Sequence, residues 1–261
     1  MKNNSPYALM LIPLLALFLI SADLISAPSN TTDFKFAIGS GYGERKKFTI
    51  PTFSEGGCLL AQIKPWPWSP SGTSKSRASQ LALILNGSDQ TEYYARADVK
   101  DSSVSPLWIS FTVPSTKVTN KVTWTISVVN FSRSGTAEGT ISLDYPPTQI
   151  PCELKAAVSK TSGKVYLSWR YIGKSFKGFF LVERSTNGKD WNKVVSGCKK
   201  ASPTTASTTT PIDFSCSDTG LTSGSTYYYR ACVVTYTTAT PSVLNCTKAK
   251  YTTPSVSARA P

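Results

Sequence analysis

Residues 148–254 contain strand-like segments in which apolar side chains recur at every second position, and this period constrains the fold most. In the segment 165–170, Val165, Leu167 and Trp169 fall on one face of an extended chain, because successive side chains of a strand point to opposite sides. Turn-forming residues separate such segments along this part of the chain. The pattern predicts short antiparallel strands with one face turned to a core.

A corner between two strands is predicted at residues 218–231, where a leucine and a glycine turn precede a strand that opens on Tyr227. A tyrosine in this place fills the edge of the core, and its hydroxyl bonds back to nearby backbone. We therefore predict that Tyr227 is the corner residue. Tyr229 and Ala231 follow it inward at period two.

A hairpin is predicted between these features. The strand 178–185 runs into Asn187-Gly188, a dipeptide that favours tight turns, and then Trp191. Taken in order, the segments of residues 148–254 resemble a fibronectin type III domain. The resemblance implies an immunoglobulin-like sandwich from a family whose members mostly space, present and bind. A fold alone does not name a ligand.

Residues 33–146 predict a second all-β unit, because alternating segments follow one another without a helical stripe. These segments are Lys47–Ile50, Cys58–Ile63, Gln80–Leu85, Leu107–Val113, Val122–Asn130 and Gly139–Tyr145. The last two, a W-x-I-x-V-x-N strand and a return strand ending in Tyr-Pro, resemble the bacterial pre-peptidase C-terminal domain. That resemblance implies a jelly-roll-like sandwich of the kind appended to secreted hydrolases, some members of which grip collagen or other polymers. The calcium-binding acidic cluster of the collagen-binding members is not evident here, so that activity is not transferred.

The expected fold class is therefore all-β, with two antiparallel β-sandwich domains in tandem. The first, residues 33–146, is jelly-roll-like, and the second, residues 148–254, is of the fibronectin type III kind. Residues 255–261 are expected to form a tail. The proline-rich link at residues 145–151 is short and stiff, which favours a preferred angle between the domains.

Residues 1–27 read as a signal peptide, with Lys2 before an apolar run and plausible cleavage after Ala22 or Ala27. An uncleaved membrane anchor is the alternative, but the run is shorter than the roughly 20 residues of a span and contains Pro13. We expect export and no transmembrane segment after cleavage.

Cysteine usage agrees with export, because an even number of cysteines in an exported chain predicts disulfides. We predict Cys198–Cys216 around a low-complexity loop and Cys232–Cys246 across a hairpin. Cys58 and Cys152 remain, and they either join the two domains or include a free thiol. The chain has 6 cysteines and no histidine, which argues against zinc sites of the usual kinds.

The formal net charge is +13 at pH 7, and Lys2 and Asp23 of the signal peptide cancel. One interpretation is attraction to an anionic partner such as an envelope polymer, an acidic polysaccharide or extracellular nucleic acid. The other is a solvated surface that keeps the protein soluble, because the positive residues occur in small dispersed groups. A steep salt dependence of binding would separate the two.

Trp66 and Trp68 form the candidate ligand-binding site. They lie in the segment Lys64-Pro65-Trp66-Pro67-Trp68-Ser69-Pro70, whose prolines hold it extended, so both rings should point the same way. A pair of exposed tryptophans is a natural platform for sugar rings. The alternative is that both rings cap the open end of the first sandwich.

Catalysis is not expected. Without histidine, Ser-His-Asp and Cys-His mechanisms are excluded. The acidic residues are scattered and show no spacing typical of a glycosidase pair. No dense acidic run suggests a calcium loop.

We expect a secreted, non-catalytic protein that binds or adheres to an extracellular or cell-surface polymer or polysaccharide, with an anionic polymer among the options. The N-terminal domain is expected to bind, and the fibronectin-like domain to act as a spacer or second contact. Two alternatives stay open: a structural subunit of an extracellular filament or matrix, paired through strand edges, and an accessory subunit of a secreted hydrolase. Ordered assembly in concentrated protein would favour the filament, and co-purification with an enzyme would favour the accessory subunit. No cofactor and no specific nucleic acid partner is expected.

Overall fold

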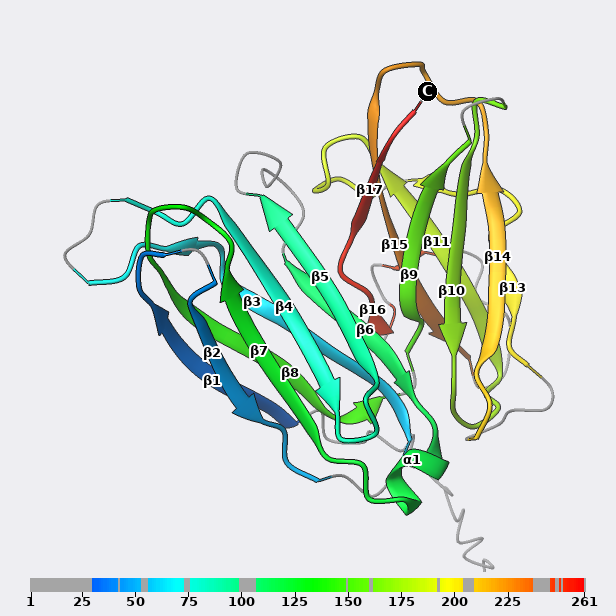
Figure 1. Cartoon of the computed structure of the whole chain (residues 1–261). Helices are drawn as coiled ribbons and strands as arrows, with labels where there is room; N and C mark the ends of the chain where they lie inside the picture. Colours follow the sequence, from blue (N-terminus) through cyan, green and yellow to red (C-terminus); the bar gives the residue numbers. More distant parts are fainter. Residues whose placement is uncertain are drawn as a thin grey trace, which may run out of the picture.

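The computed structural model describes residues 30–41, 43–52, 56–72, 76–98, 107–148, 150–159, 162–191, 193–203, 209–236, 245–246, 249 and 251–260. Within these residues the chain is strand and connecting loop, apart from the short helix α1 (Ser115–Thr119). The expected signal peptide, residues 1–27, lies outside them. The structure is all-β and forms two antiparallel sandwiches, as the alternation predicts (Figure 1).

The first sandwich consists of two four-stranded sheets. Sheet I has the order β1 (Asn30–Ile38), β8 (Ala137–Thr148), β3 (Gly57–Ser69), β6 (Trp108–Val113). Sheet II has the order β2 (Arg45–Thr49), β7 (Trp124–Asn130), β4 (Gln80–Gly87), β5 (Glu92–Asp98). The apolar alternation points inward from both sheets, so that rings such as Phe111 and Trp124 pack 4.8 Å apart between their centroids.

The second sandwich also has two sheets. Sheet III has the order β14 (Ile212–Asp218), β10 (Val165–Tyr171), β9 (Cys152–Val158). Sheet IV contains β12 (Lys193–Val194), β11 (Gly178–Ser185), β15 (Thr226–Thr235) and β16 (Tyr251–Thr252), with β13 (Lys200–Ala201) on β11 and β17 (Val256–Arg259) on β15.

The expectation of a C-terminal tail at residues 255–261 is wrong. Strand β17 pairs with β15 from Tyr229↔Val256 to Thr226↔Arg259, and Ala258 and Ala260 are buried in the second core. The residues of this strand are few, and most are small or polar, so the sequence shows no apolar alternation that would predict a strand. Ala258 and Ala260 nevertheless face the core. The second sandwich therefore extends beyond residue 254.

The predicted corner is present. The hydroxyl of Tyr227 accepts a hydrogen bond of 3.0 Å from the Thr222 backbone N–H, and the ring is buried. The predicted turn at Gly188, which has a φ of 69°, joins β11 to β12.

All six cysteines are paired in the structure. The Cys198–Cys216 disulfide links the two sides of the second sandwich, because Cys198 lies in its core and Cys216 is on β14. Cys232–Cys246 is also present, but Cys246 does not lie on a strand opposite Cys232 as expected; it sits in a short turn packed on the outer face of sheet IV. Cys58–Cys152 joins β3 of the first sandwich to β9 of the second. Three disulfides are typical of a protein that folds in an oxidising compartment.

The exposed platform of Trp66 and Trp68 is contradicted at Trp68. This ring has no exposed surface, packs in the first core and donates its Nε1–H to the Ala78 carbonyl at 2.9 Å. The segment is a continuation of β3 rather than a loop. The alternation that turns Leu59, Ala61 and Ile63 inward would leave Trp68 on the outer face, but the break in pairing between Lys64 and Ser69 reverses the faces of the strand and places Trp68 in the core. The side chain of Trp66 lies outside the described part of the structure.

Candidate functional site

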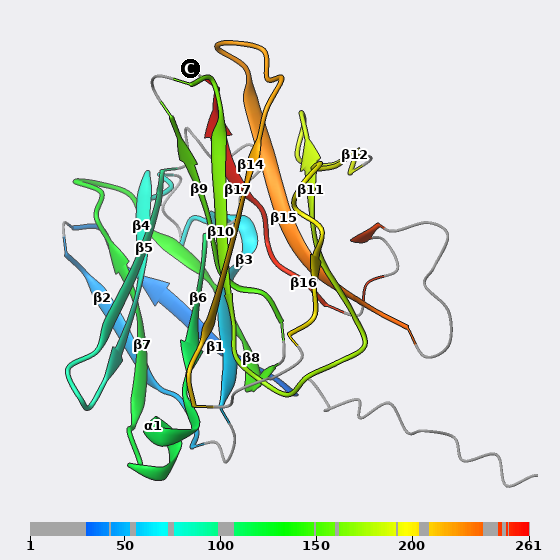
Figure 2. The ribbon, with the colours of Figure 1, turned by 90° about the vertical axis from the view of Figure 1, so that its right-hand side faces the viewer.

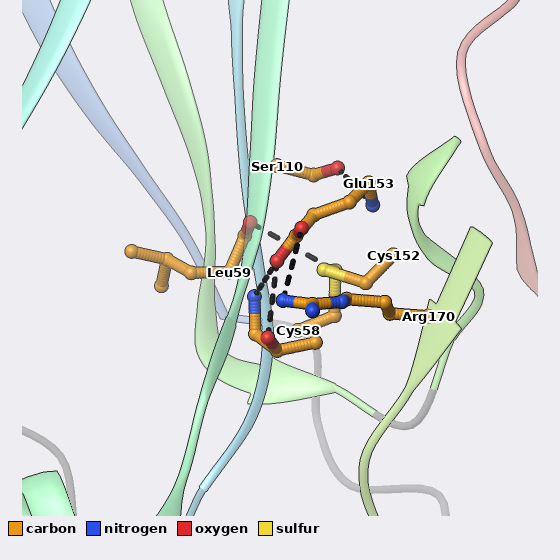
Figure 3. Close-up of a disulfide and its surroundings, with 7 residues drawn as sticks. Cys58, Leu59, Ser110, Cys152, Glu153 and Arg170 are labelled. Atoms are coloured by element: carbon orange, nitrogen blue, oxygen red, sulfur yellow. Dashed lines mark hydrogen bonds and ion pairs between the residues drawn. A yellow bond between two sulfur atoms is a disulfide. The ribbon is translucent and has the colours of Figure 1, made fainter. Parts of the chain in front are cut away.

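The outer face of sheet I meets the second sandwich (Figures 1 and 2). The Cys58–Cys152 disulfide joins the two sandwiches at this contact (Figure 3). Around the Cys58–Cys152 bridge, Leu60 and Ile150 form a small buried cluster against Trp108. The indole Nε1–H of Trp108 donates to the Ser255 carbonyl at 3.1 Å. These contacts hold two walls, one from each sandwich, at a defined separation.

Glu153, the residue after the bridging cysteine, adds polar contacts across the same interface (Figure 3). Its backbone N–H donates to the Ser110 hydroxyl at 2.8 Å, and its Oε1 accepts from the N–H and the hydroxyl of Thr112 at 2.9 and 3.0 Å. Arg170 lies 3.6 Å from its other carboxylate oxygen. The φ of Glu153 is 54°, a left-handed conformation that side chains rarely adopt, and these contacts offset its cost.

A cleft of about 400 Å³ lies between the two sandwiches, beside the contacts of the Cys58–Cys152 bridge. Its floor comes from β3 and β8 of sheet I, and its wall comes from sheet IV and the segment before β17. The lining residues are Leu60, Gln62, Asp144, Gly188, Trp191, Arg230, Thr252, Thr253, Pro254 and Ser255. Clefts at domain boundaries are frequent places for binding sites.

Asp144 and Gln62 supply the polar groups of the floor. Asp144 is partly buried, and burial raises the pKa of its carboxyl, which the neighbouring Lys64 partly counters. Among the described residues, neither side chain has a hydrogen-bond partner or an ion-pair partner closer than 4 Å. Both groups are thus free to bind a ligand that enters the cleft.

Trp191 and Arg230 form the opposite wall. The Arg230 guanidinium lies 4.5 Å from the centre of the Trp191 ring. Arg230 is held in place by Glu183, whose Oε2 accepts from its Nε and Nη2 at 2.9 and 2.7 Å. Glu183 is itself buried, and its Oε1 accepts the Cys246 backbone N–H at 2.7 Å, which ties the Cys232–Cys246 bridge to this wall.

The segment 252–255 closes the wall between β16 and β17. The backbone of Thr253 donates to the Ala231 carbonyl at 2.8 Å, while its hydroxyl accepts the Ala231 N–H at 2.9 Å. This double tether fixes the segment against β15. The cleft is therefore built on strands and tethered backbone, which keeps its groups in place before a ligand binds.

The cleft offers a carboxylate acceptor, an amide that both donates and accepts, and a tryptophan braced by a guanidinium. That set suits a ligand with hydroxyl groups around a flat apolar face. In the described residues no three acidic or cysteine side chains gather closely enough to hold a metal ion. No helix among the described residues has the length and apolar character needed to cross a membrane.

Sequence reasoning missed these residues. Asp144 stands among scattered acids, and Trp191 follows a turn with no motif around it. They come together only through the Cys58–Cys152 bridge and the packing of sheet I on the second sandwich. Their spacing along the sequence therefore does not predict a shared site. The sequence offered two signals for a fixed contact between the domains: the unassigned cysteine pair Cys58 and Cys152, and the short proline-rich link at residues 145–151.

No family model matches the sequence, and no curated protein matches it either. A β-1,2-glucanase from Parabacteroides distasonis is 11% identical over 88% of this chain and 36% of its own, with a TM-score of 0.24. A two-domain fibronectin type III segment from chicken tenascin is 14% identical over 82% of this chain and 97% of its own, also at 0.24. A GH2 β-galacturonidase from Eisenbergiella tayi is 11% identical over 74% and 33%, at 0.25. The chain spans about a third of the length of these two enzymes. The similarities are too distant to indicate a function, which has to be inferred from the site.

Proposed function

We propose that the protein is a secreted, non-catalytic binding protein for extracellular polysaccharide and that the interdomain cleft is its binding site. The observation that carries the proposal is the half-buried carboxylate of Asp144, which has no partner among the described residues and shares with Trp191 a cleft between two sandwiches that a disulfide joins. Leaving such a carboxylate without a partner costs stability, and a hydroxyl-bearing ligand would supply the missing hydrogen bonds.

Each wall has a separate part in this proposal. The ring of Trp191 contacts the apolar face of a sugar, and Arg230 behind it keeps the ring oriented. Asp144 accepts hydrogen bonds from sugar hydroxyls, and Gln62 donates or accepts beside it. The second sandwich, which resembles a fibronectin type III domain in sequence, contributes one wall of the site instead of acting only as a spacer.

Binding is tested by affinity electrophoresis and pull-down on chitin, cellulose, soluble starch, laminarin, galactomannan, polygalacturonate, collagen and DNA, at low and high salt. We expect a polysaccharide to bind with little salt dependence. The variants Asp144→Asn and Trp191→Ala should each weaken that binding about tenfold or more. The first loses hydrogen bonds to a charged group, which contribute roughly 1.5–3 kcal/mol each, and the second loses the apolar contact with the sugar ring.

Tyr166→Ala is the matched control, because Tyr166 is an exposed aromatic residue on the outer face of sheet III, away from the cleft. Trp191→Phe keeps an aromatic face and should retain part of the affinity. Unchanged binding by both cleft variants would remove the cleft as the site. Binding to polygalacturonate or DNA alone, abolished by salt, would favour the charge of the whole surface instead.

A further inference from the structure

The outer face of sheet I continues from the cleft as a polar strip, in which Ser142 is itself buried and bonded to the exposed Lys64. Along β8, Ile141 and Leu143 are fully buried toward the core, so Asp144, Ser142 and Thr140 alternate with them on the outer face. On β3, Gln62 pairs with Ser142 and Lys64 pairs with Thr140. The strip thus begins at Asp144 in the cleft and runs along two paired strands, away from the second sandwich.

A second hollow of about 520 Å³ lies at the far end of this strip. It forms where the pairing of β3 with β8 jumps from Lys64↔Thr140 to Ser69↔Glu138, because the intervening residues of β3 bulge from the ladder. Lys35 and Ala37 of β1, Lys64 and Pro65 of β3, and Thr140 and Glu138 of β8 line it. The segment 64–70, whose tryptophans and prolines suggested a binding site, therefore forms one side of a hollow, although Trp68 itself is buried.

Lys64 of β3 lies on the outer face between the two hollows, next along that face from Gln62 of the cleft. Its side chain is exposed, its Nζ donates to the Ser142 hydroxyl at 3.3 Å, and it also lines the far hollow. Asp144 and Glu138 are six positions apart on β8, which corresponds to about 20 Å at the rise of an antiparallel strand. That distance is longer than one sugar ring and suits several consecutive units of a chain.

The strip has no excess of positive charge. Lys35 and Lys64 contribute two cations, and Asp144, Glu138 and the exposed Asp33 of β1, which pairs with Ser142, contribute three carboxylates. The Arg230 guanidinium in the cleft is already paired with Glu183. On a chain with a net charge of +13, a site for a polyanion would show an excess of cations. A row of donors and acceptors without that excess fits the hydroxyl groups of an uncharged polymer instead.

We propose that this strip is an extended site for a linear, uncharged polysaccharide that occupies both hollows at once. The proposal rests on the proposed function of the cleft and adds to it a second contact region and a preference for chain length and neutral charge. The near end holds a sugar between Trp191 and Asp144, and the far end contacts the chain through Lys35, Glu138 and Thr140.

The test uses the full-length mature protein and cello-oligosaccharides and chito-oligosaccharides from disaccharide to octasaccharide, with hydroxyethyl cellulose, laminarin and soluble starch as long probes. Calorimetry gives the affinity of each. The far-end variant is Lys35→Ala with Glu138→Ala, which leaves the net charge unchanged. Lys47→Ala with Glu92→Ala is its matched control, an exposed pair on sheet II of the same sandwich.

We expect affinity to rise at least tenfold with chain length. The far-end variant should lose that gain while it still binds the shortest ligands normally, and the sheet II control should behave as the wild type. An affinity that does not depend on length, or a far-end variant that binds long chains normally, would overturn the extended site and leave the cleft standing. Failure of every neutral polysaccharide to bind would overturn the proposed function itself.

Discussion

Tyr227 shows how one hydroxyl supports the second sandwich. Its ring is buried, and its oxygen satisfies the Thr222 N–H at 3.0 Å. Tyr227→Phe should lower the free energy of unfolding by about 1 kcal/mol, because the Thr222 donor loses its partner. Urea unfolding measures the change, and Tyr166→Phe, with an exposed ring, should leave the midpoint unaltered. An unchanged midpoint in Tyr227→Phe would mean that water replaces the bond without loss.

The ionised carboxylate of Asp144, which is proposed to bind the ligand, should lower the stability of the unliganded protein. Burial raises the pKa of its carboxyl in the folded state, so the folded protein binds a proton more readily than the unfolded chain. Ionisation therefore destabilises the fold as pH rises above about 3.9, the usual pKa of aspartate, and the full cost is present at neutral pH. Asp144→Asn should unfold at a higher urea concentration than the wild type at pH 7.

This advantage of Asp144→Asn should shrink as pH falls toward the usual pKa of aspartate, because both protein states of the wild type then become protonated. Asp33→Asn, the same substitution at an exposed residue on β1, is the control for the loss of one carboxylate. Wild-type polysaccharide binding should weaken over the same acid range. An Asn variant less stable than the wild type at pH 7 would show that the carboxylate has a partner in the folded protein.

Trp68 was predicted to lie in a binding site because of its residue type, but its position in β3 places it in the core. Removing a fully buried ring leaves a cavity and orphans the Ala78 carbonyl. Trp68→Ala should therefore lower the free energy of unfolding by about 3–5 kcal/mol, and Trp68→Phe by less. Chemical denaturation followed by circular dichroism measures both. A change below about 1 kcal/mol would contradict the burial of this ring.

At the scale of elements, alternation predicted the strands that bury large side chains, such as β7 and β10, and the turn residues predicted the β11–β12 hairpin. It did not predict β5, whose alternating polar residues lie on an edge, or β17, whose inward residues are the small Ala258 and Ala260. Strands without large apolar residues acquire their structure from their neighbours. The cleft could not be predicted for a related reason: its groups come from strands that meet only after both sandwiches have docked.

Strand β17 can be used to test whether a strand without large apolar residues contributes to the stability of the second sandwich. Deleting residues 255–261 removes the partner of Tyr227 and Tyr229 on β15 and the Ser255 carbonyl that Trp108 contacts. The loss of stability should exceed the roughly 0.5–3 kcal/mol of a typical point substitution. Urea unfolding and protease resistance report it, with the exposed substitution Ser257→Ala on the same strand as control. A truncated chain that unfolds like the wild type would restore the interpretation of these residues as a tail.

At the scale of the whole molecule, the Cys58–Cys152 bridge joins residues 94 positions apart and so constrains the unfolded chain strongly. In the chain-entropy model, its loss in Cys58→Ser with Cys152→Ser should lower stability by about 4.7 kcal/mol. Glu153 and Trp108 would still hold the sandwiches together, but less firmly. Polysaccharide affinity should therefore fall as well, because the two walls of the cleft would no longer be fixed.

The control is Cys198→Ser with Cys216→Ser, a bridge over 18 positions within the second sandwich, which should cost about 3 kcal/mol in the same model. Both variants are assayed for binding at a temperature where they remain folded. Weaker binding in the interdomain variant and normal binding in the control would show that the bridge acts on the cleft, beyond its effect on stability. Equal binding by both variants would mean that Glu153, Trp108 and the buried cluster around Leu60 alone determine how the two sandwiches sit, and the covalent link would then serve stability only.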